Sequence, residues 1–224
     1  AKTLVEEAHK RGLFVLFDGV FGHHKYNIKA SPSGLLPAGN YNEVDYNDPN
    51  SRAFYQEVVT YWIKTLKIDG WRFDQVYQVP IEDWRSIKNT AEMVSSTVSY
   101  KNNKGKMVHP LAYMVAEVLD NENKITRTAY GNKNTPPVLD SAFDFPMRTR
   151  LVQTLATDET GMSHDKNNLP ATTLAEGFAT HAAYPEHAMP NLILGNHDLV
   201  RFGDLIQRSG LSDPTETSYW QRHQ

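Results

Sequence analysis

Four short segments of the chain carry almost every residue that could do chemistry. They span residues 17–24, 69–74, 115–118 and 194–201, and each ends a run typical of a buried β-strand. The candidate reactive side chains in them are Asp18, His23, Arg72, Asp74, Glu117, His197 and Asp198. Carboxylates, imidazoles and a guanidinium at successive strand ends are typical of the catalytic rim of a (β/α) barrel. The pattern therefore predicts an enzyme.

The segment 69–74 offers a candidate nucleophile. Strand alternation puts Arg72 and Asp74 on the same face, close enough for the guanidinium to keep the carboxylate ionised and oriented. An ionised, immobilised aspartate is a competent nucleophile toward an anomeric carbon. A structural Arg-Asp pair inside a barrel would give the same local pattern, so this segment alone leaves both interpretations open.

Glu117 is the candidate general acid. It ends the apolar run 113–118, whose neighbours should disfavour the charged carboxylate and raise its pKa. A salt-bridge partner or a solvated rim residue is the alternative for a single glutamate at a strand end. The combination with Asp74 favours chemistry, because glycoside hydrolysis with retention needs two carboxyl groups with pKa values pushed apart.

The segment 196–198 adds a third carboxylate beside an imidazole. His197 and Asp198 follow the apolar run 192–194 and precede Arg201. The alternative makes Asp198 the N-cap of a helix that runs through Ile206. Near His23 and His24 a metal site is conceivable, but no His-x-His or His-Glu-x-x-His spacing supports one.

The elements that must position these side chains alternate between helical and strand periods. Gly12 can end a helix with Leu4, Val5 and Ala8 on one face, and the pair Asp48-Pro49 is a strong helix start. A further helix is predicted over residues 81–98. The predicted strands cover residues 13–17, 70–73, 113–118, 138–145 and 191–194, the first of them covered on both faces. The polar stretches 158–168 and 209–224 read as rim loops.

These strands predict a parallel sheet with right-handed crossovers. A closed barrel needs eight strands. We therefore expect an incomplete (β/α)8 TIM barrel, about strands 3 to 7, with two strands before Ala1 and one after Gln224, in a chain that is a fragment or a processed form. The expected organisation is a first barrel part over 1–23, a short inserted subdomain over 24–47 and the rest of the barrel over 48–224.

Composition excludes several classes of protein. The net charge is -3 with no basic run, which argues against nucleic-acid binding. No apolar run approaches the roughly 18 residues needed to cross a bilayer, so no membrane partner is expected. The chain has no cysteine, which removes disulfides and thiol nucleophiles but leaves the cellular compartment open.

The four segments, in this order, resemble the four sequence regions of the α-amylase family of glycoside hydrolases. Asp18 to His23 is similar to the first region, Gly70 to Asp74 to the second, Glu117 to the third and 196–198 to the fourth. The resemblance implies a (β/α)8 barrel and a retaining enzyme that cleaves α-glucosidic bonds in α-1,4-glucans or maltooligosaccharides. A transglycosylase or isomerase with the same site, or a non-catalytic carbohydrate-binding relative, are the alternatives.

The resemblance also implies a role for each residue. Asp74 corresponds to the nucleophile, Glu117 to the acid/base and Asp198 to the third carboxylate. His23, Arg72 and His197 correspond to residues that hold the sugar. Asp18 is expected to orient Arg72, and Arg201 to give structural support.

Two departures from the family pattern stand out. Gly22 replaces the asparagine that usually precedes the histidine and is often tied to a calcium site, so no cofactor is expected and calcium is disfavoured. The residues after Asp74 are Gln75, Val76, Tyr77 and Gln78 instead of a run ending in the Lys-His pair of many starch-degrading members. Recognition on the product side of the scissile bond is therefore expected to differ. The oligomeric state is left open.

Overall fold

The computed structural model describes residues 1–157, 169–210 and 213–224. These residues form two compact units. Unit 1 comprises Ala1–Val118, Lys124–Ala142 and Pro185–Met189. Unit 2 comprises the described parts of Leu119–Asn123, Phe143–Tyr184 and Pro190–Gln224. The predicted division at residues 23 and 47 stays a prediction.

The main sheet confirms the predicted parallel architecture. Its order is β1-β4-β7-β8-β9, and β1 with β4, β4 with β7, and β7 with β8 pair in parallel. The bounds are Leu16–Val20 for β1, Gly70–Asp74 for β4, Tyr113–Ala116 for β7, Ser141–Phe143 for β8 and Met189–Asn191 for β9. A parallel sheet of five strands with intervening helices fits part of a (β/α) barrel.

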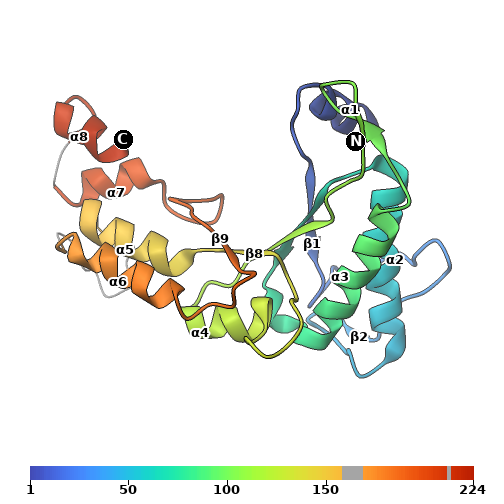
Figure 1. Ribbon diagram of the computed structural model, residues 1–224. Coiled ribbons are helices and arrows are strands. Elements are labelled where there is room, and N and C mark those ends of the chain that lie inside the picture. The colour runs from blue at the N-terminus through green and yellow to red at the C-terminus, as the bar shows by residue number, and fades with distance from the viewer. Residues whose placement is uncertain (158–168, 211–212) are drawn as a thin grey trace. The chain divides into compact units, whose positions relative to one another are not determined.

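One helix of unit 1 precedes the first strand of this sheet, and two longer helices lie between its first strands along the chain. They are α1 (Lys2–Lys10), α2 (Pro49–Leu66) and α3 (Ile81–Ser95). The helices α2 and α3 lie side by side (Figure 1). As predicted, α2 begins after Asp48, whose carboxylate accepts a hydrogen bond from the backbone N of Asn50 at 2.8 Å, with proline in the first helical turn.

Short elements complete unit 1 and its junctions. The antiparallel pairs are β2 (Gly39–Asn40) with β3 (Glu43–Val44), and β5 (Tyr100–Lys101) with β6 (Met107–Val108). The first pair lies in the segment expected to be an inserted subdomain. A 3-10 turn, η1 (Val76–Gln78), follows β4, and α4 (Glu122–Ile125) continues into a π-helical turn, η2 (Thr126–Tyr130).

The core of unit 1 is aromatic and fixes which way β4 faces. Phe73 packs with its ring centroid 4.8 Å from Phe21 and 4.5 Å from Trp84, and both Phe73 and Trp84 are fully buried. Successive side chains of a strand point to opposite faces. Because Trp71 and Phe73 enter this core, Arg72 and Asp74 are directed to the other face.

Unit 2 is built mainly from helices. They are α5 (Phe145–Leu155), α6 (Thr172–His181), α7 (Phe202–Arg208) and α8 (Thr217–His223). Val152 and Ala156 pack against Phe202, Leu205 and Ile206 in its buried cluster. None of the helices in the described residues of either unit is long and apolar enough to cross a bilayer.

The structure corrects several sequence-based expectations. The first strand covers Leu16–Val20 instead of 13–17, and Leu13 and Phe14 are exposed instead of covered on both faces. The cause is the register of the pairing, which begins at Leu16 opposite Gly70, so Leu13 and Phe14 precede the strand. The last predicted strand is likewise displaced, to Met189–Asn191.

Two further expectations concern the C-terminal part. The stretch 209–224 is not wholly a loop, because α8 forms there with Tyr219 packed on the buried cluster of unit 2. The alternative that Asp198 caps the last predicted helix is wrong, since α7 begins at Phe202 after Arg201. The predicted rim loop 158–168 lies outside the described residues.

Candidate active site

Strand register brings four of the predicted site residues together in unit 1. Asp18 in β1 pairs with Arg72 in β4, so the two side chains occupy the same level of neighbouring strands. Phe73 pairs with Ala116, and the backbone N of Glu117 donates to Phe73 O at 2.8 Å. Glu117 therefore stands at the level of Asp74 at the carboxyl ends of β4 and β7, as the barrel interpretation requires.

Arg72 is the centre of this cluster. Its Nη1 donates to Asp18 Oδ1 at 2.8 Å and to Asp74 Oδ1 at 2.8 Å, and its Nη2 lies 2.8 Å from Glu117 Oε1. Arg72 is 13% exposed, Asp74 20% and Glu117 12%, whereas Asp18 is 59% exposed. One guanidinium thus contacts three carboxyl groups, and the predicted contact of Arg72 with Asp18 and Asp74 is confirmed.

The pKa values of the two central carboxyl groups move in opposite directions. Burial raises the pKa of Glu117, and the neighbouring Asp74 carboxylate raises it further, against the opposing charge of Arg72. Burial also acts to raise the pKa of Asp74, but its hydrogen bonds with Glu117 and Arg72 outweigh burial and lower it. When the pair binds one proton, these directions place it on Glu117 and leave Asp74 ionised.

The backbone after Asp74 also reaches Glu117. The backbone of Gln75 adopts a left-handed conformation with φ 43°, which is uncommon for a residue other than glycine. Its backbone N donates to Glu117 Oε2 at 3.3 Å, and the next backbone N, of Val76, donates to Glu117 O at 3.1 Å. The turn that ends β4 thereby holds the Glu117 carboxyl in place.

His23 is half-buried and bonded to a residue whose contact the sequence did not reveal. Its Nδ1 lies 2.7 Å from Gln78 Oε1. His23 also lies near enough to Asp74 for a positive charge on the ring to lower the pKa of that carboxyl. The one sequence signal for Gln78 was its place in the run after Asp74 that departs from the family pattern.

Asp198 and its neighbours belong to unit 2. His197 Nε2 lies 3.1 Å from Asp198 Oδ2, and the backbone N of Asp198 donates to Asn196 Oδ1 at 2.9 Å. Arg201 donates to the backbone oxygen of Asn196, which supports its predicted structural role in this segment. His197 is 68% exposed and Asp198 57%. The approach of these side chains to Asp74 and Glu117 stays a prediction.

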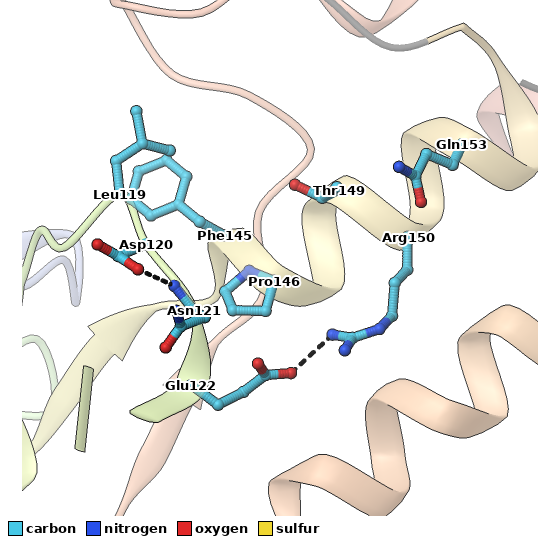
Figure 2. Close-up of a pocket in the computed structure, with 9 residues that line it drawn as sticks. All are labelled: Leu119, Asp120, Asn121, Glu122, Phe145, Pro146, Thr149, Arg150 and Gln153. Carbon is cyan, nitrogen blue, oxygen red and sulfur yellow. Dashed lines mark hydrogen bonds and ion pairs between the residues drawn. The ribbon is translucent and has the colours of Figure 1, made fainter. Parts of the chain in front are cut away.

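Unit 2 holds a cavity of its own, of about 690 Å³, beside the first turns of α5 (Figure 2). Two charged side chains that line it form an ion pair, with Arg150 Nη1 2.8 Å from Glu122 Oε1. Thr180 on α6 also donates from Oγ1 to that oxygen, at 2.6 Å. Burial opposes ionisation of Glu122, but these two partners lower its pKa. None of the predicted site residues lines this cavity.

Gly22 stands where the family often has the asparagine tied to a calcium site, and the expectation that calcium is disfavoured stays a prediction. Gly22 offers no side-chain oxygen, and a Cβ atom there would overlap the side chain of Gln78. Within the described residues, no cluster of three or more His, Asp or Glu side chains could hold a metal ion.

Comparison with known proteins decides the family. The family model "Alpha amylase, catalytic domain" matches residues 37–217. The chain belongs to the α-amylase family. Its curated relatives include a cyclomaltodextrinase of Thermoanaerobacter pseudethanolicus, 25% identical over 90% of this chain and 36% of the relative. A maltogenic α-amylase of Bacillus acidopullulyticus is 22% identical over 92% of this chain and 36% of the relative.

Solved structures of the α-amylase family agree. The crystal structure of AmyP in complex with maltose is 55% identical, covers 99% of this chain and 43% of AmyP, and superposes with a TM-score of 0.93. A further AmyP structure contains maltotriose. The α-amylase of Geobacillus thermoleovorans, at 20% identity, 93% of this chain and 46% of that enzyme, shares the fold with a TM-score of 0.65. The chain thus spans less than half the length of these relatives.

Proposed function

We propose that the protein of which this chain is part is a retaining glycoside hydrolase that cleaves α-glucosidic bonds in α-1,4-glucans or maltooligosaccharides. The observation that carries the proposal is the placement of Asp74 and Glu117 on one guanidinium, each 2.8 Å from a nitrogen of Arg72, with pKa values moved in opposite directions. Membership of the α-amylase family and the maltose and maltotriose complexes of AmyP support the substrate class.

The mechanism is double displacement. Glu117 protonates the glycosidic oxygen while the Asp74 carboxylate attacks the anomeric carbon, which gives a β-glucosyl ester on Asp74 through an oxocarbenium-like transition state. Water, deprotonated by Glu117, then releases the sugar with its α configuration retained. Retaining enzymes have carboxyl groups about 5 to 5.5 Å apart, and the contact of both carboxyl groups with Arg72 brings Asp74 and Glu117 close together.

The remaining predicted site residues assist this reaction. Arg72 keeps Asp74 ionised and in position, and Asp18 holds the guanidinium from the other side. His23 and His197 bind hydroxyl groups of the sugar at the cleavage site, and Asp198 binds them as an acceptor.

The test is the stereochemistry of the first product. The full-length protein is incubated with maltooligosaccharides, and the anomeric protons are followed by NMR before mutarotation. Initial release of the α-anomer supports the proposal. Initial release of the β-anomer, or no cleavage, contradicts it. Products longer than the substrate would indicate that a sugar acceptor competes with water, which is transglycosylation through the same intermediate.

A further inference from the structure

We propose that Gln78 is a positioning residue that fixes the tautomer of His23, and that Gly22 provides the space this contact needs. The proposal rests on the proposed function, in which His23 binds the sugar. It concerns two positions, 22 and 78, at which this chain departs from the pattern of the family it resembles.

The hydrogen bonds around Gln78 determine which end of its amide faces His23. Gln78 Nε2 donates to Gln75 Oε1 at 2.8 Å, and Tyr77 OH donates to the same oxygen at 3.0 Å. The Gln78 oxygen is therefore the atom that lies 2.7 Å from His23 Nδ1. A carbonyl oxygen can only accept a hydrogen bond. Hence His23 carries its proton on Nδ1.

This tautomer determines what His23 offers to a substrate. With Nδ1 bonded to Gln78, the ring presents Nε2, which has no hydrogen-bond partner among the residues that the structure describes. A neutral ring then accepts a hydrogen bond from a sugar hydroxyl through Nε2, and a protonated ring donates one. The charged groups near the ring include Asp74, whose pKa a positive charge on His23 lowers. A hydrogen bond to one ring nitrogen is the usual means of setting the chemistry of the other.

Gly22 is required for the contact on steric grounds. A Cβ atom built on Gly22 would overlap both Cβ and Oε1 of Gln78. Since the second of these is the atom that accepts from His23, any larger residue at position 22 would push the amide oxygen off Nδ1. The same network ends at the Glu117 carboxyl, because Gln75 N donates to Glu117 Oε2 at 3.3 Å. Gly22, Gln78 and Gln75 thus connect the sugar-binding histidine with the candidate general acid.

The experiment uses the full-length protein with ¹⁵N-labelled histidine. Its first readout is the ¹⁵N NMR spectrum, with the signals of His23 assigned by their loss in His23→Asn. Its second is kcat/KM on a maltooligosaccharide. The variants are Gln78→Leu, which removes the acceptor, Gln78→Glu, which keeps an acceptor oxygen, and Gly22→Ala, which displaces the amide. The matched control is Gln56→Leu, because Gln56 donates to Ser86 and Thr90 between α2 and α3.

In the unaltered protein we expect the proton of the neutral His23 ring on Nδ1. Gln78→Leu and Gly22→Ala should give a mixture of tautomers and lower kcat/KM by about tenfold, the worth of one hydrogen bond. Gln78→Glu should keep the Nδ1 proton and recover most of the activity. Gln56→Leu should change neither readout.

Two results would overturn the proposal. One is a His23 ring with its proton on Nε2 in the unaltered protein, and the other is a Gln78→Leu variant with unchanged tautomer and kcat/KM. Failure of the proposed function looks different. If the unaltered protein cleaves no α-glucan, the hydrolase assignment falls, while the NMR spectra still decide whether Gln78 fixes the His23 tautomer.

Discussion

Arg72 Nη1 lies 2.8 Å from Asp74 Oδ1, two residues further along the same strand. The alternation of β4 places both side chains on the face opposite to Phe73, and the second guanidinium nitrogen lies 2.8 Å from Glu117. The rigid fork of an arginine can contact two carboxyl groups at once, which a single ammonium group cannot do in the same geometry. The charge and the shape of Arg72 therefore both matter.

Replacement of Arg72 by lysine tests this geometry. Arg72→Lys keeps the charge but not the fork, so Asp74 and Glu117 are no longer held by one group. We expect kcat/KM on maltooligosaccharides to fall by about 100-fold, comparable to the loss of one preorganised electrostatic contact. The control is Arg208→Lys, because Arg208 is exposed in the last turn of α7. Its kcat/KM should stay within twofold of the unaltered protein, since surface substitutions usually change the free energy of unfolding by no more than about 0.5 kcal/mol. Equal effects in the two variants would contradict the role of Arg72.

Replacement of Asp74 by asparagine removes the proposed nucleophile with little change of shape. We expect kcat to fall roughly ten-thousandfold, as is typical when a reacting group is removed. The circular dichroism spectrum should stay unchanged. The variant should also lose the part of the Glu117 pKa increase that the Asp74 carboxylate causes. Normal turnover in Asp74→Asn would remove Asp74 from its role.

The pH dependence of activity follows from the two pKa directions. Asp74 must be ionised, and its pKa lies below the ordinary value of 3.8, so activity should appear as pH rises through that low range. Glu117 must be protonated, and its pKa lies above 4.5, so activity should decline as pH rises beyond that raised value. A bell-shaped profile of kcat/KM is expected. Glu117→Gln should remove the alkaline limb.

A substrate that needs no acid catalysis separates Glu117 from Asp74. Fluoride leaves α-glucosyl fluoride without protonation. In Glu117→Gln, the Asp74 carboxylate should therefore displace fluoride far faster than the variant cleaves a maltooligosaccharide. Asp74→Asn should be inactive on both, because it lacks the group that forms the covalent bond. Burst kinetics of fluoride release measure this step directly. Equal losses on both substrates in Glu117→Gln would argue against general acid catalysis by Glu117.

Asp198 provides a test of the second unit. If Asp198 is the third carboxylate of the site, its negative charge is needed for activity. Asp198→Asn is then expected to lower kcat/KM by roughly 100-fold or more. If Asp198 were only an exposed surface residue, its replacement would leave kcat/KM almost unchanged and alter the free energy of unfolding by no more than about 0.5 kcal/mol. Asp204→Asn, another exposed aspartate of unit 2, is the control. Indistinguishable kinetics for the two variants would show that Asp198 takes no part.

Gly70 is needed for the close approach of β4 and β7. A Cβ atom at this position would overlap the backbone oxygen of Tyr113. Gly70→Ala should therefore destabilise the protein by about 3 kcal/mol, since backbone on the neighbouring strand cannot move aside as a side chain can. At Gly195 the nearest atom to a built Cβ is 3.8 Å away, so Gly195→Ala should cost about 0.5 kcal/mol or less. Urea unfolding of both variants measures the difference, and equal midpoints would contradict it.

The sequence by itself determined the parallel sheet, the helices α2 and α3 and the contact between Arg72 and Asp74 on β4, but not the helix α8. The alternation of apolar and polar residues through Asp74 depends only on strand geometry, so the Arg72 contact could be predicted from spacing. The Asp48 cap of α2 is equally local. The ends of β1 and β9 were misplaced because continuous apolar runs carry no period that marks where pairing starts. The register with β4 sets the ends of β1, whereas β9 has β8 as its neighbour in the sheet.

Only the tertiary structure decided how residues far apart in the chain meet. Gln78 forms a hydrogen bond with His23, 55 residues away in the sequence, and Gly22 leaves the space for this contact. No local sequence pattern at either Gln78 or Gly22 predicts the contact. The opposite pKa shifts of Asp74 and Glu117 likewise depend on a shared guanidinium and on burial, which are properties of the folded site. Spacing along a strand fixes which face a side chain takes, whereas distance between strands and the desolvation of a charge exist only after the strands have packed.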